Sequence, residues 1–125
     1  MTSEQSGVRT AYAEVTPYIT KDGSEIRELM HPALHHARNQ SLAEATVPPG
    51  CETRLHRHRN TEEIYHIAAG TGRMRLGETE FDVAAGDTVL IRPGTAHSIR
   101  NTGADALRIL CACAPAYAHD DTELL

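Results

Sequence analysis

The segment GCETRLHRHRNTEEIYHIAAG, residues 50–70, decides how this chain is interpreted. It places His56 and His58 two residues apart and Glu63 five residues after the second histidine. Residues two apart on a β-strand project to the same side, so both imidazoles can bind one metal ion. The segment therefore predicts part of a metal site. Taken alone, residues 54–59 could also be a solvated basic strand edge, and Glu63 a surface carboxylate.

A second segment, GDTVLIRPGTAHSIRN at residues 86–101, brings in His97. His97 follows a Pro-Gly turn and lies on a separate strand-like stretch. Three imidazoles and one carboxylate on neighbouring strands could converge on a single ion. His97 considered by itself could equally be a hydrogen-bonded loop residue.

Short apolar runs separated by turn signals extend over most of the chain. Phe81 and Val83 alternate with Glu80 and Asp82, which is the period-two pattern of a strand. Regularly spaced turns of this kind indicate an all-β sandwich or barrel. Turn residues recur at 21–23, 48–50, 70–72, 77–78, 85–87, 93–94 and 101–103.

The length of 125 residues suits one domain. We expect residues 1–10 to be a flexible N-terminus and residues 11–125 to form a single barrel domain. Residues 30–40 could hold one short helical turn, and residues 120–125 are interpreted as a tail.

Composition and charge narrow the possible partners. The net charge of −5 argues against nucleic acid, which needs a basic face. No segment is apolar for long enough to span a membrane, and the start lacks a secretory pattern, so a cytoplasmic protein is expected. Cys51, Cys111 and Cys113 are expected to be free thiols and small core residues.

The two segments resemble the two cupin motifs. Residues 50–70 match Gly-x5-His-x-His-x4-Glu-x6-Gly, and residues 86–101 match Gly-x5-Pro-x-Gly-x2-His-x3-Asn at every position except Arg92, where the pattern has Pro. The resemblance implies a double-stranded β-helix, or jelly-roll, barrel. It also implies that one divalent metal ion is bound by His56, His58, Glu63 and His97.

The strand period predicts which neighbours share the inner face with Glu63. Tyr65 points inward with it, and His66 points the other way. Glu63 and Tyr65 are therefore the candidates for catalysis, although the Tyr65 ring could equally be core filler with a satisfied hydroxyl.

Three arginines are left open. Arg73 and Arg75 share one face of their strand, and the sequence does not show whether that face is the inner one; an inward arginine would bind a carboxylate or phosphate. Arg92 follows a strand and precedes Pro93, and it either points to solvent or changes the surroundings of the turn.

Three histidines and a carboxylate suit Zn, Fe, Mn, Ni or Co. The resemblance then implies either a metal-dependent enzyme or a small-molecule sensing or binding module. The enzyme would act on a small polar or anionic molecule, as a dioxygenase or as a Lewis-acid isomerase, cyclase or lyase. A biosynthetic pathway is one setting in which such an enzyme would work. A homodimer is expected, because pairing or exchange of a strand at residues 11–19 would protect exposed edges.

Overall fold

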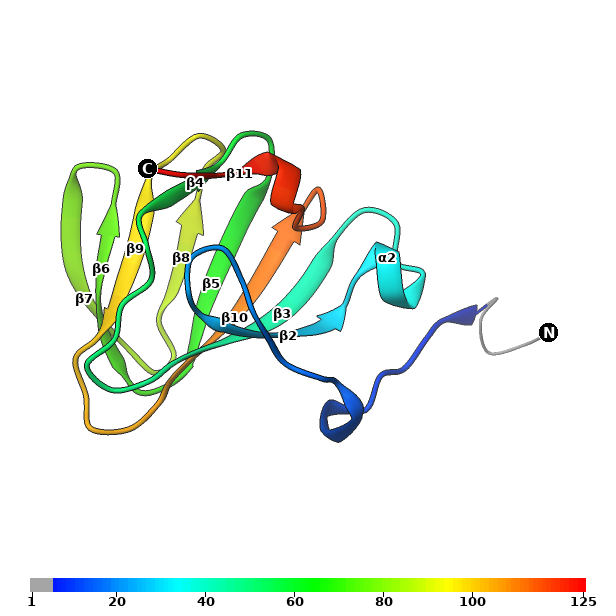
Figure 1. The fold of residues 1–125 in the computed structure, drawn as a ribbon, viewed down its shortest axis with the longest axis horizontal. Coiled ribbons are helices and arrows are strands. Elements are labelled where there is room, and N and C mark those ends of the chain that lie inside the picture. The colour runs from blue at the N-terminus through cyan, green and yellow to red at the C-terminus, as the bar shows by residue number, and fades with distance from the viewer. Residues whose placement is uncertain (1–5) are drawn as a thin grey trace.

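The computed structural model describes residues 6–125, which form two antiparallel β-sheets facing each other (Figure 1). This arrangement confirms the expected all-β jelly roll. The expectation of a flexible N-terminus falls partly on residues 1–5, which lie outside the described residues, and it stays a prediction. The elements are η1 (Tyr12–Glu14), β1 (Tyr18–Ile19), β2 (Glu25–Met30), α2 (Pro32–His35), β3 (Ser41–Val47), β4 (His56–His58), β5 (Glu62–Ala69), β6 (Thr71–Leu76), β7 (Thr79–Ala84), β8 (Thr88–Ile91), β9 (His97–Asn101), β10 (Leu107–Ala114), η2 (His119–Asp121) and β11 (Thr122–Leu124).

The first sheet has the order β1-β2-β3-β10-β5-β8, and the second has the order β11-β4-β9-β6-β7. Strand β10 lies between β3 and β5 in the first sheet, and across β10 and β5 Ile109 pairs with Ile67 and Cys111 with Tyr65. Alternate residues of each strand are buried, as the period-two pattern predicts. Within residues 6–125, no helix is long and apolar enough to cross a membrane.

The core lies between the two sheets and is aliphatic. Its largest fully buried apolar side chains come from six different strands of the two sheets, so burial ties the sheets together. They are Val47, Ile67, Met74, Ile91, Ile99, Leu107 and Ile109.

Two of the motif glycines have a clear physical role. Gly70 has a φ of +88°, and a Cβ there would lie 2.9 Å from the carbonyl oxygen of Ala106. Gly94 has a φ of +81° in a turn closed by the Thr95 N–H donating to the Arg92 carbonyl oxygen at 3.1 Å. The Arg92 side chain is exposed, so the departure from the motif leaves the turn intact.

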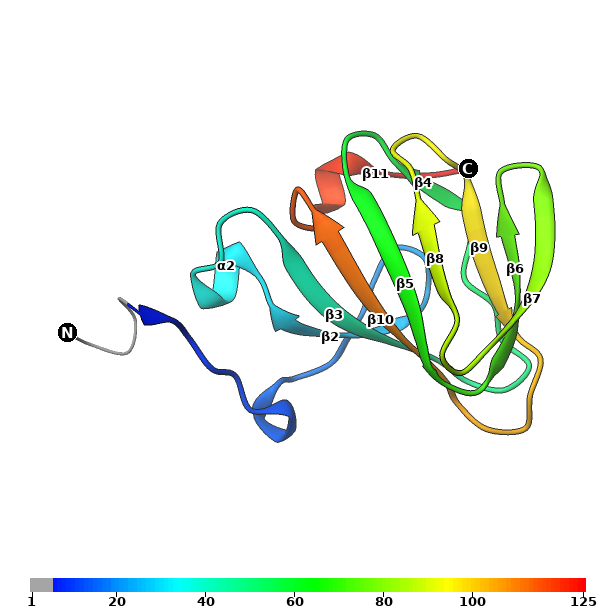
Figure 2. The same ribbon diagram turned by 180° about the vertical axis from the view of Figure 1, so that it is seen from behind.

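Three expectations about local structure are corrected. Residues 11–19 do not form one strand; they contain a 3-10 turn and the two-residue strand β1. Residues 6–17 lie outside the space between the sheets (Figure 2) and contact the first sheet, where the Thr10 hydroxyl donates to the Leu29 carbonyl oxygen at 2.7 Å. The C-terminal residues are not a tail, because β11 pairs with β4. Cys51 is exposed rather than part of the core, since it follows the turn at residues 48–50, whereas Cys111 and Cys113 are buried; all three thiols are free.

Candidate metal centre

Strand β4 carries the first two histidines into the barrel. His56 and His58 are both buried, and Arg57 between them points outward and pairs with Glu123 at 2.9 Å. The alternation of histidine and arginine thus follows the strand period: imidazoles face the interior, and guanidinium groups face water. The alternative interpretation of residues 54–59 as a solvated basic strand edge therefore describes the arginines but not the two histidines.

Strand β9 brings the third histidine alongside. His97 pairs with His56 across the two strands, and the centroids of their rings are 4.2 Å apart. The side chain of His97 is completely buried. One nitrogen from each of His56, His58 and His97 lies within 4.8 Å of the others, close enough for all three to hold one metal ion.

Backbone carbonyls set the tautomers of two histidines. His56 Nδ1 lies 2.7 Å from the carbonyl oxygen of Arg54, and His97 Nδ1 lies 2.9 Å from that of Thr95. A carbonyl only accepts hydrogen bonds, so each Nδ1 carries the proton and each Nε2 of the neutral ring keeps a lone pair. Such partners orient histidine ligands in metal sites.

Thr122 performs the same task for His58. The Thr122 hydroxyl donates to the Ala118 carbonyl oxygen at 2.9 Å, which leaves Oγ1 to accept from His58 Nδ1 at 2.9 Å. All three Nε2 atoms therefore present lone pairs to one small region. Sequence reasoning missed Thr122, because its only sequence context is a C-terminal stretch without a motif.

Glu63 lies beside two of the three histidines. Its Oε1 atom is 3.1 Å from His58 Nε2 and 3.4 Å from His97 Nε2. Burial opposes ionisation, but the neighbouring rings of His58 and His97 lower the pKa of Glu63 to about 2, so the carboxylate is ionised. A neutral His58 cannot donate from both nitrogens, so this close contact calls for a positive charge, on the ring or on an ion. The Cys113 thiol donates to Glu63 Oε2 at 3.3 Å.

One buried nitrogen atom shows whether the site suits a metal ion. His97 Nε2 is buried and has no hydrogen-bond partner among residues 6–125. An unsatisfied buried polar atom is costly and calls for an explanation. A divalent ion bound by the three nitrogens would satisfy it, so the residues present fit the group.

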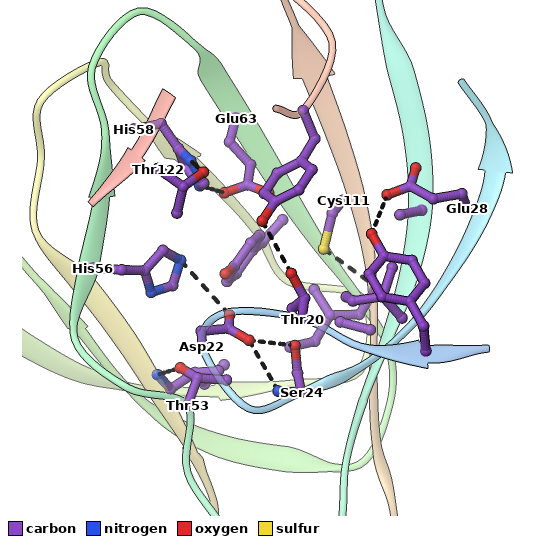
Figure 3. A pocket seen from close by; sticks show the side chains of 18 residues that line it. Thr20, Asp22, Ser24, Glu28, Thr53, His56, His58, Glu63, Cys111 and Thr122 are labelled. Atoms are coloured by element: carbon purple, nitrogen blue, oxygen red, sulfur yellow. Dashed lines mark hydrogen bonds and ion pairs between the residues drawn. The ribbon is translucent and has the colours of Figure 1, made fainter. Parts of the chain in front are cut away.

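A cavity opens beside the histidines between the two sheets (Figure 3). The cavity has a volume of about 40 Å³, which gives room for a small ligand. Its lining combines apolar side chains with hydroxyl, carboxyl and imidazole groups. The apolar ones include Ile26, Ala43, Ala45, Ile99 and Ile109, and the polar ones include Thr20, Asp22, Ser24, Thr53 and His56.

Tyr65 is inward, as predicted, and lines this cavity. Its ring centroid lies 5.9 Å from that of His97. Burial, together with the charge of Glu63, raises the pKa of Tyr65 well above its usual value, so the hydroxyl keeps its proton. Within residues 6–125 that hydroxyl makes no hydrogen bond to a protein group, which leaves it available to a ligand. His66 points outward, as predicted.

Arg73 and Arg75 face away from the cavity. They lie with Glu52, Glu80, Ser98 and Arg100 on the outer side of the second sheet, and Arg73 pairs with Asp82 at 3.2 Å. The buried partner on their strand is Met74. An inward arginine that binds a substrate anion is therefore not present on this strand.

Asp22 is a residue of the site that sequence reasoning placed only in a turn. Its Oδ1 accepts from the Ser24 N–H at 2.9 Å and from the Ser24 hydroxyl at 2.6 Å. Its Oδ2 faces His56 Nε2 at 3.7 Å. The Lys-Asp-Gly turn signal places the residue in a loop, but the direction of its side chain depends on the folding of that loop over the barrel mouth.

Comparison with known proteins agrees with this structure. The chain is 52% identical to an uncharacterized protein of Methanocaldococcus jannaschii over 94% of both chains. It is 34% identical to auxin-binding protein 1 of Arabidopsis thaliana over 62% of this chain and 43% of that protein. Among solved structures, a predicted oxalate decarboxylase from Thermotoga maritima is 29% identical with a TM-score of 0.73, covering 84% of this chain and 96% of that one.

The family match covers the segments that carry the site. The family described as cupin domain matches residues 43–113, which include β4, β5, β9 and all four candidate ligands. Motif spacing, jelly-roll topology and the convergence of three histidines all agree with this match. The chain belongs to the cupin domain family.

Proposed function

We propose that this cupin is a metal-dependent enzyme that acts on a small polar molecule, with His56, His58, Glu63 and His97 holding one divalent ion. The observation that carries the proposal is the set of three tautomers. Each Nδ1 is committed to an oxygen acceptor, so three Nε2 lone pairs converge where Glu63 supplies negative charge. That arrangement is unfavourable without a cation.

The donor set of three nitrogens and one oxygen suits Zn, Fe, Mn, Ni or Co. A bound ion would act as a Lewis acid or bind an oxidant or substrate at a position that the protein leaves open. Lyase-type chemistry is supported by the similarity to a chain described as a predicted oxalate decarboxylase. Isomerisation, cyclisation and oxygen insertion are the other reaction classes compatible with the donor set.

Glu63 and Tyr65 have distinct proposed roles. Glu63 adjusts the charge at the ion, and the thiol of Cys113 helps to hold its second oxygen. Tyr65 presents a protonated hydroxyl to the cavity and would donate a hydrogen bond to a bound substrate. The apolar side chains in the cavity lining would exclude water from the reacting groups.

A non-catalytic binding module is the second candidate. It is favoured by the similarity to auxin-binding protein 1, whose name states a binding role. The same cavity and ion would then hold a ligand without turning it over. The two candidate functions predict different effects of a change of charge at the ion: loss of turnover in the enzyme, and altered ligand affinity in the binding module.

Glu63→Gln separates them, with Glu62→Gln as a matched control on the outer face of the same strand. In the enzyme, the variant should retain part of its metal and lose turnover by orders of magnitude, because the charge at the ion sets the acidity or redox potential of what it binds. The control should behave like the parent. Absence of metal-dependent turnover by the parent, together with tighter carboxylate binding by Glu63→Gln, would establish the binding module instead.

We also propose that the protein is a cytoplasmic homodimer. Free thiols suit a reducing compartment. Val8 and Tyr12 in the N-terminal segment and Ile19 in β1 are exposed, and pairing two copies there would cover them. Light scattering at micromolar concentration should give twice the chain mass. A value near 13.6 kDa would refute the dimer.

A further inference from the structure

Asp22 offers a free carboxylate oxygen to the cavity. The residue is only 8% exposed, and its Oδ1 is fully engaged by Ser24. Among residues 6–125, Oδ2 has no hydrogen-bond donor; its near neighbour is His56 Nε2 at 3.7 Å. Figure 3 shows Asp22 between His56 and Ser24 among the side chains that line the cavity.

The two facing atoms are both acceptors. His56 Nδ1 donates to the Arg54 carbonyl oxygen, so Nε2 of the neutral ring has a lone pair and no proton to give. A carboxylate oxygen also accepts only. Two buried acceptors that face each other are unfavourable unless a cation or a donor group lies beside each of them. An ion on Nε2 would satisfy His56, and Asp22 would then need a donor from whatever the ion binds.

The charge of the cavity restricts what that partner can be. None of the eighteen lining residues is Lys or Arg, whereas three are acids, namely Asp22, Glu28 and Glu63. A divalent ion with ionised Glu63 and Asp22 leaves no net charge, and any charge on Glu28 adds to the negative side. An anionic ligand would therefore bring uncompensated negative charge into a buried space.

We propose that Asp22 accepts a hydrogen bond from the ligand and that the cavity takes a small neutral molecule with hydroxyl or amide donors rather than a carboxylate anion. This inference rests on the proposed metal site and narrows its substrate class. The ligand places a donor group next to the atom that binds the ion, and its carbon skeleton contacts apolar lining residues such as Ile26 and Ile109. Asp22 acts as a recognition residue that selects against anions.

The test compares lactamide with lactate, which have the same skeleton and hydroxyl group but differ in charge. Protein loaded with Co(II) is titrated with each, and dissociation constants are taken from the visible spectrum of the ion. The parent should bind lactamide at least about tenfold more tightly, because lactate meets the unpaired carboxylate of Asp22. Asp22→Asn should abolish or reverse this preference while keeping its cobalt. Glu25→Gln, three residues away and outside the cavity lining, should keep the preference of the parent.

Equal or tighter binding of lactate by the parent would overturn the inference, as would an unchanged preference in Asp22→Asn. Loss of cobalt from Asp22→Asn would also overturn it, by making Asp22 a ligand of the ion. If that variant loses its cooperative melting transition, Asp22→Ser replaces it, because it also removes the carboxylate and should likewise abolish the preference. A parent that takes up no cobalt would contradict the proposed function itself, whereas a cobalt-loaded parent without preference contradicts only the role of Asp22.

Discussion

Two histidine–threonine pairs lie on different sheets of this barrel, one on the inner side of the second sheet and one on the outer side of the first. Inside, His58 Nδ1 meets Thr122 Oγ1 at 2.9 Å across β4 and β11; outside, His66 Nδ1 meets Thr88 Oγ1 at 2.8 Å across β5 and β8. The pairs share residue types, atoms and cross-strand geometry. They differ in what lies beyond the ring. Nε2 of His58 joins two other imidazoles and a carboxylate, whereas His66 is exposed to water.

The comparison shows that the position of a histidine in the barrel, and not its bonding partner, decides whether it can bind a metal ion. The same rule holds for charge: arginines outside the second sheet have carboxylates and water around them, whereas the inner carboxylates Asp22 and Glu63 have histidines beside them. An inner substitution should therefore change folding or metal binding, and its outer counterpart should change little.

The largest effect is expected in the core of β5. Ile67→Ala removes a fully buried side chain and should lower the free energy of unfolding by about 2–5 kcal/mol. Ile64→Ala, three residues earlier and 39% exposed, should cost less than about 1.5 kcal/mol. Urea unfolding of both variants measures the difference. Equal losses of unfolding free energy in the two variants would contradict the assignment of Ile67 to the buried face of β5 and Ile64 to its exposed face.

The two histidine–threonine pairs can be compared directly. Thr122→Val removes the acceptor that orients His58 and should weaken metal binding about 10- to 100-fold. Thr88→Val makes the same chemical change beside His66 and should leave metal affinity unaltered. Competition with a chromophoric chelator measures both. An equal affinity of the two variants would mean that Thr122 does not support the site.

The smallest effect is expected on the outer face. Arg73→Ala removes an ion pair with Asp82, whose side chain is 81% exposed, and should change the free energy of unfolding by less than about 1 kcal/mol. The small loss should shrink further in high salt, because solvent ions screen the pair. Thermal unfolding at two salt concentrations checks both statements, and a loss as large as that of Ile67→Ala would refute them.

The sequence predicted much of this molecule because period-two patterns and spaced motifs are local signals. The strand alternation at residues 63–67 placed Glu63 and Tyr65 inside and His66 outside, as the structure has them. The two motifs also named the histidines that converge. In contrast, the face presented by Arg73 and Arg75 required the structure, since both faces of that strand contain long side chains.

The remaining residues depend on contacts between distant parts of the chain. Thr122 reaches His58 only because the C-terminal segment adds a strand beside β4, and this pairing has no local signal. Asp22 reaches His56 because a turn folds over the barrel mouth. Cys51 shows the opposite error, since a small apolar residue beside a motif lies in an exposed turn. Loops and chain ends are placed by tertiary contacts, which residue patterns do not reveal.

Metal content is the most direct test of the central claim. Elemental analysis should be made on protein purified without a histidine tag, for the parent, for His56→Ala, His58→Ala and His97→Ala, and for His66→Ala as the outer control. The convergence of three Nε2 atoms predicts about one divalent ion per chain in the parent and in His66→Ala. Each of the three inner variants should lose most of the metal. Full occupancy in all three would contradict the assignment of this cluster as the metal centre.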